Sequence, residues 1–259
     1  MANSITILPI ANLGNINEGS DLISMIADAL LSNEVQDGDI VVIAHKIISK
    51  AEGRVVHMDS AVPSERALEL AAITKKDPRQ IQVILDESRE VLYAQEGVLV
   101  CLDKRGLACA NAGVDASNAE PRQLVLLPED PDGSAKQLHD ALTKKLNKKF
   151  GIIICDTHGR PFRNGAAGIC IGACGVVTQK SYIGQKDLYG YVMKSSIEAV
   201  SDELSAAATL VMGQGSEGIP VAIIRGYDGL GSGTAKENIR SKESDIAMQL
   251  MSNNMNAKA

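Results

Sequence analysis

Asp39-Ile40-Val41-Val42-Ile43-Ala44 follows the turn-forming pair Asp37-Gly38 and contains five consecutive apolar residues. A short apolar run that begins at a turn and is rich in β-branched residues is typical of a buried strand. Upstream, apolar residues recur at helical spacing, at Leu22, Ile23, Ile26, Ala29 and Leu30. Because helices alternate with strands in this half of the chain, we expect a mixed α/β fold.

Start signals and apolar periodicity predict three further helices. Asp77-Pro78-Arg79-Gln80 combines an N-cap, a first-turn proline and a capping-box glutamine, so we expect a helix from there to about Leu92. A second helix is expected to begin at Ser134, and a third to run from Ser195 to Met212. We expect one domain over residues 1–259. The turn-rich stretch 128–133 is either a joint between two subdomains or a surface loop.

Composition excludes several classes of protein. The chain has 259 residues, 26 of them basic and 32 acidic, giving a net charge of −6. It is 45% hydrophobic, enough to offset the chain entropy lost on folding. A general nucleic-acid binder would need a basic face, and two Phe, five Tyr and no Trp leave almost no stacking platform. We therefore expect a globular protein that does not bind nucleic acid.

No apolar run approaches the roughly 20 residues that a spanning helix requires. The N-terminus has neither a basic region nor a long apolar stretch, so it does not resemble a signal peptide, and we expect a cytoplasmic protein with no membrane partner. Five cysteines are odd in number and lie in apolar context, which favours reduced core thiols. Cys170 and Cys174 lack a second pair or nearby His, so we favour core packing over zinc.

The glycine-rich stretch Gly213-Gln214-Gly215-Ser216-Glu217-Gly218 matches a dinucleotide-binding fingerprint in its letters. It follows the predicted helix and precedes the apolar run Val221–Ile224, which reads as a strand. The fingerprint needs the opposite order, strand first and helix second. The sequence therefore excludes a Rossmann interpretation.

Oxygen-bearing side chains cluster in two places. Asp156 and Thr157 follow the apolar run 152–155, a predicted strand, and such oxygens suit Mg²⁺ or Mn²⁺. Asp115 and Asn118 lie around a glycine-containing turn with few bulky neighbours. The alternatives stay open, because a strand-end Asp is also a common cap and the second cluster is also an ordinary Asx turn.

Basic side chains form two further clusters. Lys46, Lys50 and Arg54 are four residues apart, so in a helix they would share one face and hold a polyphosphate or simply face solvent. Arg160 and Arg163 follow Asp156 closely, and guanidinium groups match phosphate and carboxylate geometry. Together with the carboxylates, these cations predict a site for a metal ion and an anion.

Six strings follow one another between Leu13 and Arg240: residues 48–54, 63–67, 111–118, 131–134, 156–163 and 183–190. In these strings the chain resembles the coenzyme F-420:L-glutamate ligase family, the γ-glutamyl ligases of deazaflavin biosynthesis. The resemblance implies a mixed α/β fold of that family, distinct from ATP-grasp, and a homodimer with the nucleotide site near the subunit interface. It also implies a GTP-dependent ligase that adds L-glutamate to the terminal carboxylate of the F-420 precursor and extends it through γ-glutamyl linkages.

The resemblance further implies which residues act. One or two Mg²⁺ or Mn²⁺ ions, with a monovalent cation such as potassium as a further expectation, would be held by Asp115, Asp156, Thr157 and Gln214. GTP would contact Leu13, Gly14, Asn15, Ile16, His45, Lys46, Lys50, Asn118, Met212, Gly213, Gln214, Gly215, Ser216, Glu217, Gly218 and Ile219. Apart from the resemblance, phosphoryl transfer needs cations near the developing charge, and we expect Lys50, Arg160 or Arg163 to stabilise it.

Two other functions remain open. Residues 13–16 and the pair His45-Lys46 depart from the family's usual residues, which favours a ligase of the same mechanism acting on another carboxylate. The third hypothesis is a nucleotide-binding module without catalysis. For the ligase, amide formation requires an activated acid, so we expect an acyl phosphate formed from GTP.

Overall fold

A computed structural model describes residues 4–256. Its centre is a five-stranded sheet in the order β1-β12-β2-β8-β9. β2 and β8 are parallel, and every other neighbouring pair is antiparallel. The strands are β1 (Thr6–Ile10), β2 (Ile40–Ala44), β8 (Gly151–Arg160), β9 (Arg163–Cys174) and β12 (Val221–Arg225). The predicted strands at 39–44, 152–155 and 221–224 are confirmed, as is the mixed α/β fold.

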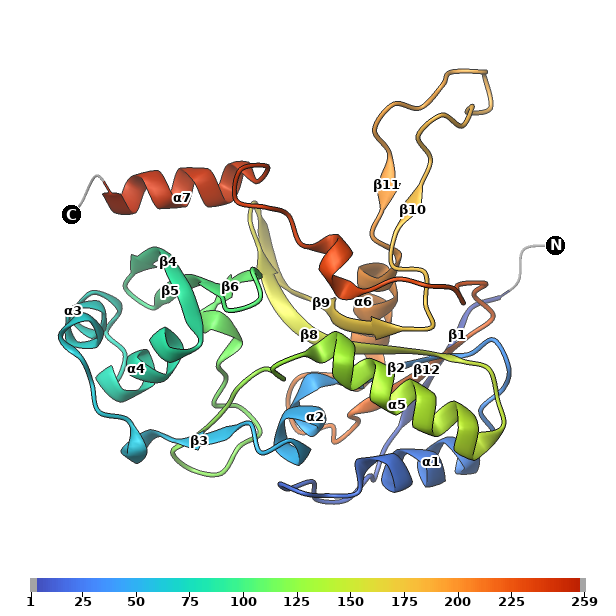
Figure 1. Cartoon of the computed structure of the whole chain (residues 1–259), viewed down its shortest axis with the longest axis horizontal. Coiled ribbons are helices and arrows are strands. Elements are labelled where there is room, and N and C mark those ends of the chain that lie inside the picture. The colour runs from blue at the N-terminus through green and yellow to red at the C-terminus, as the bar shows by residue number, and fades with distance from the viewer. Residues whose placement is uncertain (1–3, 257–259) are drawn as a thin grey trace.

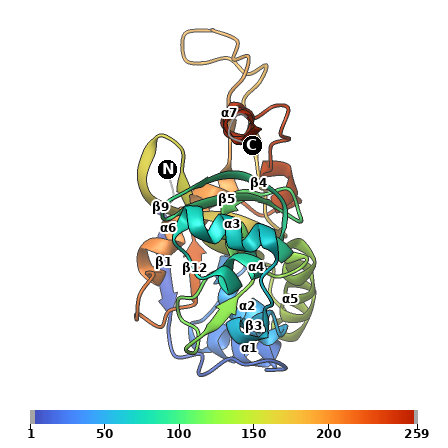
Figure 2. The same cartoon turned by 90° about the vertical axis from the view of Figure 1, so that its left-hand side faces the viewer.

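Both faces of this sheet are covered, because its central strands are apolar on both sides. On β2, Val41 and Ile43 pack into a core with α1 (Leu22–Ser32), α2 (His45–Ala51) and α5 (Pro131–Leu146). Ile40 and Val42 point the other way, toward α6 (Val200–Met212) and η3 (Ala235–Asn238). Figure 2 shows α5 and α6 on opposite sides of the sheet. The result is a layer of strands between two layers of helices.

The two apolar clusters that flank the sheet are together the first core. A second core lies apart from them; it is built from residues 55–126 and includes buried Leu70, Ile81 and Leu99. It packs two helices against the three-stranded sheet β4-β5-β6, beside the pair β3-β7. Its elements are β3 (Val55–His57), η1 (Met58–Ser60), α3 (Glu65–Thr74), α4 (Pro78–Asp86), β4 (Ser88–Gln95), β5 (Val98–Asp103), β6 (Ala108–Ala110), η2 (Asn111–Gly113) and β7 (Gln123–Val125).

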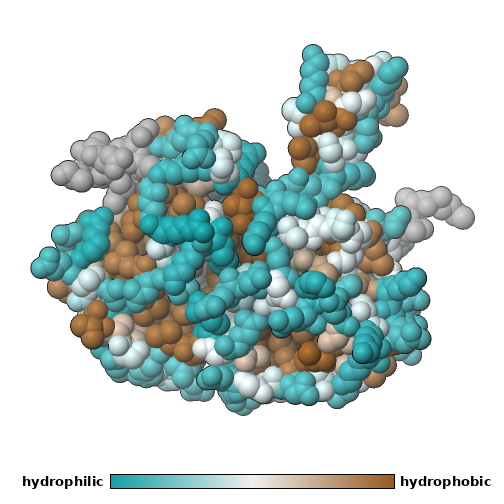
Figure 3. Space-filling view, viewed as in Figure 1, coloured by the Kyte–Doolittle hydropathy of each residue, from teal (hydrophilic) through white to brown (hydrophobic). Residues whose placement is uncertain are grey.

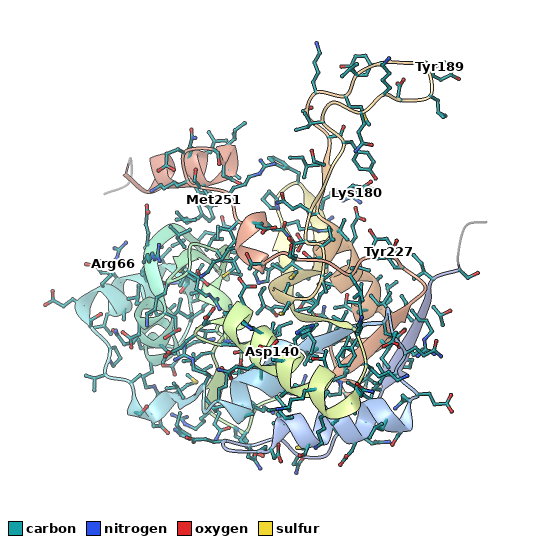
Figure 4. All side chains as sticks on the ribbon, turned by 45° about the vertical axis from the view of Figure 1, so that its right-hand side comes forward. Arg66, Asp140, Lys180, Tyr189, Tyr227 and Met251 are labelled. Carbon is teal, nitrogen blue, oxygen red and sulfur yellow. The ribbon has the colours of Figure 1, made fainter. Side chains whose placement is uncertain are left out.

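Two segments extend from this body. β10 (Lys180–Ser181) and β11 (Ile197–Glu198) form the base of an arm whose tip carries Tyr189, while Lys180 lies at its base (Figures 1 and 4). Apolar side chains are exposed along the arm (Figure 3), and Leu188 is 99% and Tyr189 95% exposed. At the other end of the molecule, α7 (Ile246–Asn256) packs near β4.

Three predicted helix boundaries are wrong. The helix from Asp77 ends at Asp86 rather than Leu92, because β4 begins at Ser88 and pairs with β5. α5 begins at Pro131 rather than Ser134, since the proline takes the first helical position after Asp130. α6 begins at Val200 rather than Ser195, because Ile197 and Glu198 pair with β10. In two of the three cases pairing with the adjacent strand along the chain overrides the local helical pattern.

All five cysteines are free, and four of them are buried, which confirms the prediction of reduced core thiols. Burial raises the pKa of Cys170 to about 12. Among residues 4–256, no helix is both long and apolar enough to cross a membrane.

Asp77 gives the first testable prediction. It caps α4 by accepting from the Arg79 amide at 2.9 Å, and the Arg79 guanidinium lowers the pKa of this carboxyl to about 2. A lowered pKa stabilises the fold above the ordinary value of 3.8, and the gain disappears as the pH falls toward 2. Asp77→Asn keeps a capping oxygen without the charge, so we expect it to cost about 0.5 kcal/mol at pH 7, since solvent screens this partly exposed pair. Thermal unfolding should show the variant and the parent converging at low pH, and a constant difference would contradict the assignment.

Candidate active site

A cavity of about 910 Å³ lies where the central sheet meets the second core. Five stretches of chain that are far apart in sequence line it: residues 12–18, 44–55, 115–123, 155–157 and 209–220. Most predicted nucleotide and metal residues fall on these stretches. The sequence clusters at 45–50, 115–118, 156–157 and 212–219 therefore converge on one cavity.

Asp156 reaches the cavity because neighbouring strands end at different points. β2 pairs with β8 as far as Ala44 opposite Cys155, and the chain then turns into α2. β8 continues, so Asp156 and Thr157 lie just past the end of β2, beside the first turn of α2. The prediction that these two residues follow a buried strand segment is confirmed, although β8 itself runs on to Arg160 in a hairpin with β9.

Two histidines flank the Asp156 carboxylate. His158 Nε2 lies 2.9 Å from Oδ2, and His45 Nε2 lies 3.4 Å from Oδ1. Burial alone would raise the pKa of Asp156, but the two imidazoles outweigh burial and hold the pKa well below its usual range. Asp156 is therefore a carboxylate at neutral pH, and cationic groups are favoured beside it.

Asp115 is presented by a tight turn. Asn111, Ala112 and Gly113 all have positive φ, and Asp115 then pairs with Val125 through two backbone hydrogen bonds. The Ser117 amide and hydroxyl donate to its two carboxylate oxygens, each at 2.8 Å. Burial raises the pKa of Asp115, but the hydrogen bonds from Lys46 and Ser117 lower it by a larger amount, so the net shift of this pKa is downward. This turn thus presents a second carboxylate to the cavity.

Helix α2 supplies the cations. Lys46 and Lys50 lie one turn apart, and both line the cavity. Lys46 Nζ is 2.6 Å from Asp115 Oδ2, and Lys50 Nζ donates to the Asn118 carbonyl at 2.7 Å. Arg54 does not join them, because α2 ends at Ala51. Its guanidinium instead pairs with Glu87 at 2.6 Å, outside the helix face that was expected to include it.

The glycine-rich loop closes another wall of the cavity. It lies between α6 and β12, which confirms that the order is helix then strand and excludes a Rossmann fingerprint. Gly213 has a φ of 68°, and the Glu217 carboxylate accepts from the Gly215 amide at 2.7 Å. The Glu217 side chain therefore stabilises the loop to which it belongs. Gln214 lines the cavity together with its neighbours in this loop, whereas Ser216 does not.

Arg160 and Arg163 are not brought to the cavity of this chain. They face each other in register at the end of the β8–β9 hairpin, and both are exposed. In Figure 1 this hairpin rises away from the rest of the sheet. Their closeness to Asp156 in sequence does not persist in space, because an extended strand of four residues carries Arg160 well beyond the end of β2.

The cavity offers a donor set suited to a hard divalent cation. Asp115, Asp156, Thr157 and Gln214 present two carboxylates, a hydroxyl and an amide, all oxygen ligands. Within the described part of the chain, no group of three or more His, Cys, Asp or Glu side chains is arranged to hold a metal. A cation here would thus have few charged ligands from the protein, an arrangement typical of Mg²⁺ that shares its ligands with substrate phosphates.

A family profile described as F420-0:gamma-glutamyl ligase matches residues 11–226. The chain belongs to that family. As a member of the F420-0:gamma-glutamyl ligase family it is a ligase, which confirms both the predicted family and the predicted enzyme class.

Full-length relatives agree with this family assignment. The coenzyme F420:L-glutamate ligase of Archaeoglobus fulgidus is 43% identical over 93% of this chain and 96% of its own length. The enzyme of the same name from Methanocaldococcus jannaschii is 42% identical over 89% of this chain and 92% of its own length. That from Methanosarcina mazei is 43% identical over 90% of this chain and 91% of its own length. The γ-glutamyl ligase match thus spans both the central sheet and the second core.

Two contributors to the cavity and its carboxylates were missed in the sequence. Ser117 holds Asp115 and Lys46 together, and the Asp115-x-Ser117 spacing that produces such a turn could have indicated it. His158 contacts Asp156 directly, and no role was assigned to it from the sequence. Alternation along β8 places residues 156 and 158 on one face of the strand, and this is the signal that would have found it.

Proposed function

We propose that this chain joins L-glutamate to the terminal carboxylate of F420-0 and then extends the product through γ-glutamyl linkages, using GTP and Mg²⁺ or Mn²⁺. The observation that carries the proposal is the convergence of Asp115, Asp156, Thr157, Gln214 and two lysines on one cavity. The names of the relatives support glutamate as the amine and the coenzyme F420 precursor as the acceptor.

The proposed chemistry follows from the poor reactivity of a carboxylate toward an amine. The γ-phosphoryl group of GTP passes to the acceptor carboxylate, giving an acyl phosphate and GDP. The glutamate nitrogen then attacks the acyl carbon, the C–O bond to phosphate breaks, and inorganic phosphate leaves with the proton balance completed by solvent. Phosphoryl transfer depends mostly on positioning and charge neutralisation, and the cavity provides both.

Each side chain has a proposed part in this scheme. Asp115, Asp156, Thr157 and Gln214 would hold one or two divalent ions, which when bound neutralise phosphate charge and polarise the transferred group. Lys50 extends from the face of α2 that lines the cavity and would bind phosphate oxygens. His45 and His158 orient the Asp156 carboxylate. The 12–18 segment and the loop 212–219 would enclose the nucleotide.

The proposal extends to a homodimer acting in the cytoplasm. The exposed apolar side chains of the arm, Leu188 and Tyr189, support the homodimer because a second copy would remove them from water. In that arrangement Arg160 and Arg163 would act only if the subunit interface brings them to a cavity. The monovalent cation stays a prediction.

The deciding experiment is a product assay. Purified protein with F420-0, L-glutamate, GTP and Mn²⁺ should yield a glutamylated product, GDP and phosphate in equal amounts, detected by mass spectrometry and nucleotide chromatography. Chelation of the metal should abolish all three. Binding of GTP without any product would contradict the ligase and favour a nucleotide-binding module.

A panel of acceptor carboxylates tests the second hypothesis, in which a ligase of the same mechanism acts on a carboxylate other than that of F420-0. Other carboxylates presented with the same GTP and glutamate should give at least about tenfold lower kcat/KM, a difference that corresponds to about 1.4 kcal/mol of transition-state binding. A different preferred acceptor would keep the mechanism and change the substrate.

A further inference from the structure

Lys46 and Lys50 lie one turn apart on α2 and line the same cavity, yet they contact different kinds of group. The Lys46 ammonium lies 2.6 Å from Asp115 Oδ2 and donates to the Ser117 hydroxyl at 2.6 Å. Lys50 donates to the backbone carbonyl of Asn118 at 2.7 Å. Of the two lysines, Lys46 is therefore the one whose ammonium is bound to a carboxylate proposed above as a metal ligand.

The contacts of Asp115 leave no free direction for a second cation on Oδ2. That oxygen accepts from both Lys46 and the Ser117 hydroxyl, while Oδ1 accepts from the Ser117 amide. A divalent ion and an ammonium cannot share one carboxylate oxygen without strong mutual repulsion. For a metal ion to bind Asp115 through Oδ2, Lys46 must leave.

We propose that Lys46 is a built-in counter-cation that occupies Asp115 in the metal-free protein and is displaced when a divalent ion binds. Its flexible four-carbon stem lets the ammonium move into the cavity, where a nucleotide phosphate can accept its hydrogen bonds. Metal binding would thereby release the Lys46 ammonium to bind the nucleotide phosphate, so binding of the metal ion and binding of the nucleotide are coupled. This inference rests on the proposed function and assigns Lys46 a positioning role within it.

Metal binding without nucleotide gives a test that does not use activity. Mn²⁺ is titrated into the parent, Lys46→Met and Lys50→Met, and free Mn²⁺ is measured by electron paramagnetic resonance. The two variants lose the same charge from the same helix face, so they share any general electrostatic effect. We expect Lys46→Met to bind Mn²⁺ about tenfold more tightly than Lys50→Met, within the usual range of coupling between sites.

The Mn²⁺ titration distinguishes failure of the Lys46 counter-cation from failure of the proposed metal site. Equal affinity of the two variants, or weaker binding by Lys46→Met, overturns the counter-cation while leaving the proposed metal site in place. Absence of Mn²⁺ binding by all three proteins, both alone and with a non-hydrolysable GTP analogue, removes the metal site, and with it both the inference and that part of the proposed function.

A second measurement uses the unmodified sequence, so it does not depend on a variant folding. Lysines are acetylated briefly with acetic anhydride, and the modification of Lys46 is compared with that of Lys50 by mass spectrometry. Saturating Mg²⁺ should raise the Lys46-to-Lys50 ratio several-fold, and a non-hydrolysable GTP analogue should lower it again. A ratio that Mg²⁺ leaves unchanged would overturn the release of Lys46.

Discussion

Asp156→Asn is expected to lower the rate of glutamate ligation by at least about 100-fold without unfolding the protein. Asparagine keeps the size of the side chain and one oxygen, so packing at the end of β2 should persist. It removes the negative charge that His45 and His158 face and that a divalent ion would require. Initial rates of GDP release at saturating F420-0, with Mn²⁺ affinity measured in parallel, provide the check.

Asp202→Asn is the matched control for this substitution. Asp202 lies on α6, is half-buried like Asp156, and accepts from the Cys170 amide at 2.9 Å, but it does not line the cavity. Burial raises the pKa of this carboxyl, so its charge is not favoured by its surroundings. We expect the control to retain activity within about threefold. Full activity of Asp156→Asn would remove Asp156 from the metal site.

Gly172→Ala is expected to lower the free energy of unfolding by about 3 kcal/mol, the upper part of the range for overpacking. Gly172 lies on β9 where the first turn of α5 crosses the sheet. An added Cβ would come within 2.3 Å of the Pro131 carbonyl oxygen and 2.5 Å of its carbon, which are backbone atoms. Since α5 cannot move without disturbing the core on that face, the clash must be absorbed by strain.

Gly159→Ala on the neighbouring strand is the control. A Cβ at Gly159 would meet nothing within 4 Å, and the residue does not have a positive φ. Thermal unfolding should place Gly172→Ala roughly 6–12 °C below the parent and leave Gly159→Ala within about 2 °C of it. Similar Tm values for the two variants would show that α5 is less closely packed on β9 than the distances indicate.

Local sequence patterns predicted the elements that depend on few neighbours. The strand at 39–44 was recognisable because a buried strand needs only a turn and a run of apolar residues. The helix after Asp77 began where its cap and proline required. Its end was misplaced because residues 88–92 have a pattern compatible with a helix, and only pairing with β5 makes them a strand. That pairing depends on the fold rather than on the segment itself.

Some residues that line the cavity were singled out in the sequence by their chemistry, Asp115, Asp156 and Thr157 as hard oxygens and Lys46 and Lys50 as cations, whereas Gln214 and most of the nucleotide contacts were implied only by the family resemblance. Distance along the chain was a poor guide to which of them meet. Arg160, four residues from Asp156, is carried away along an extended hairpin. Ser117, which is 71 positions from Lys46, is its hydrogen-bond partner.

The amino-acid sequence alone determined the kind of chemistry available and the short elements that carry it, since caps, turns and apolar periodicity act over a few residues. The tertiary structure decided which groups share the cavity. Where β2 ends, how far β8 continues and where the second core rests are set by packing between distant segments, and those contacts form only when the whole chain has folded.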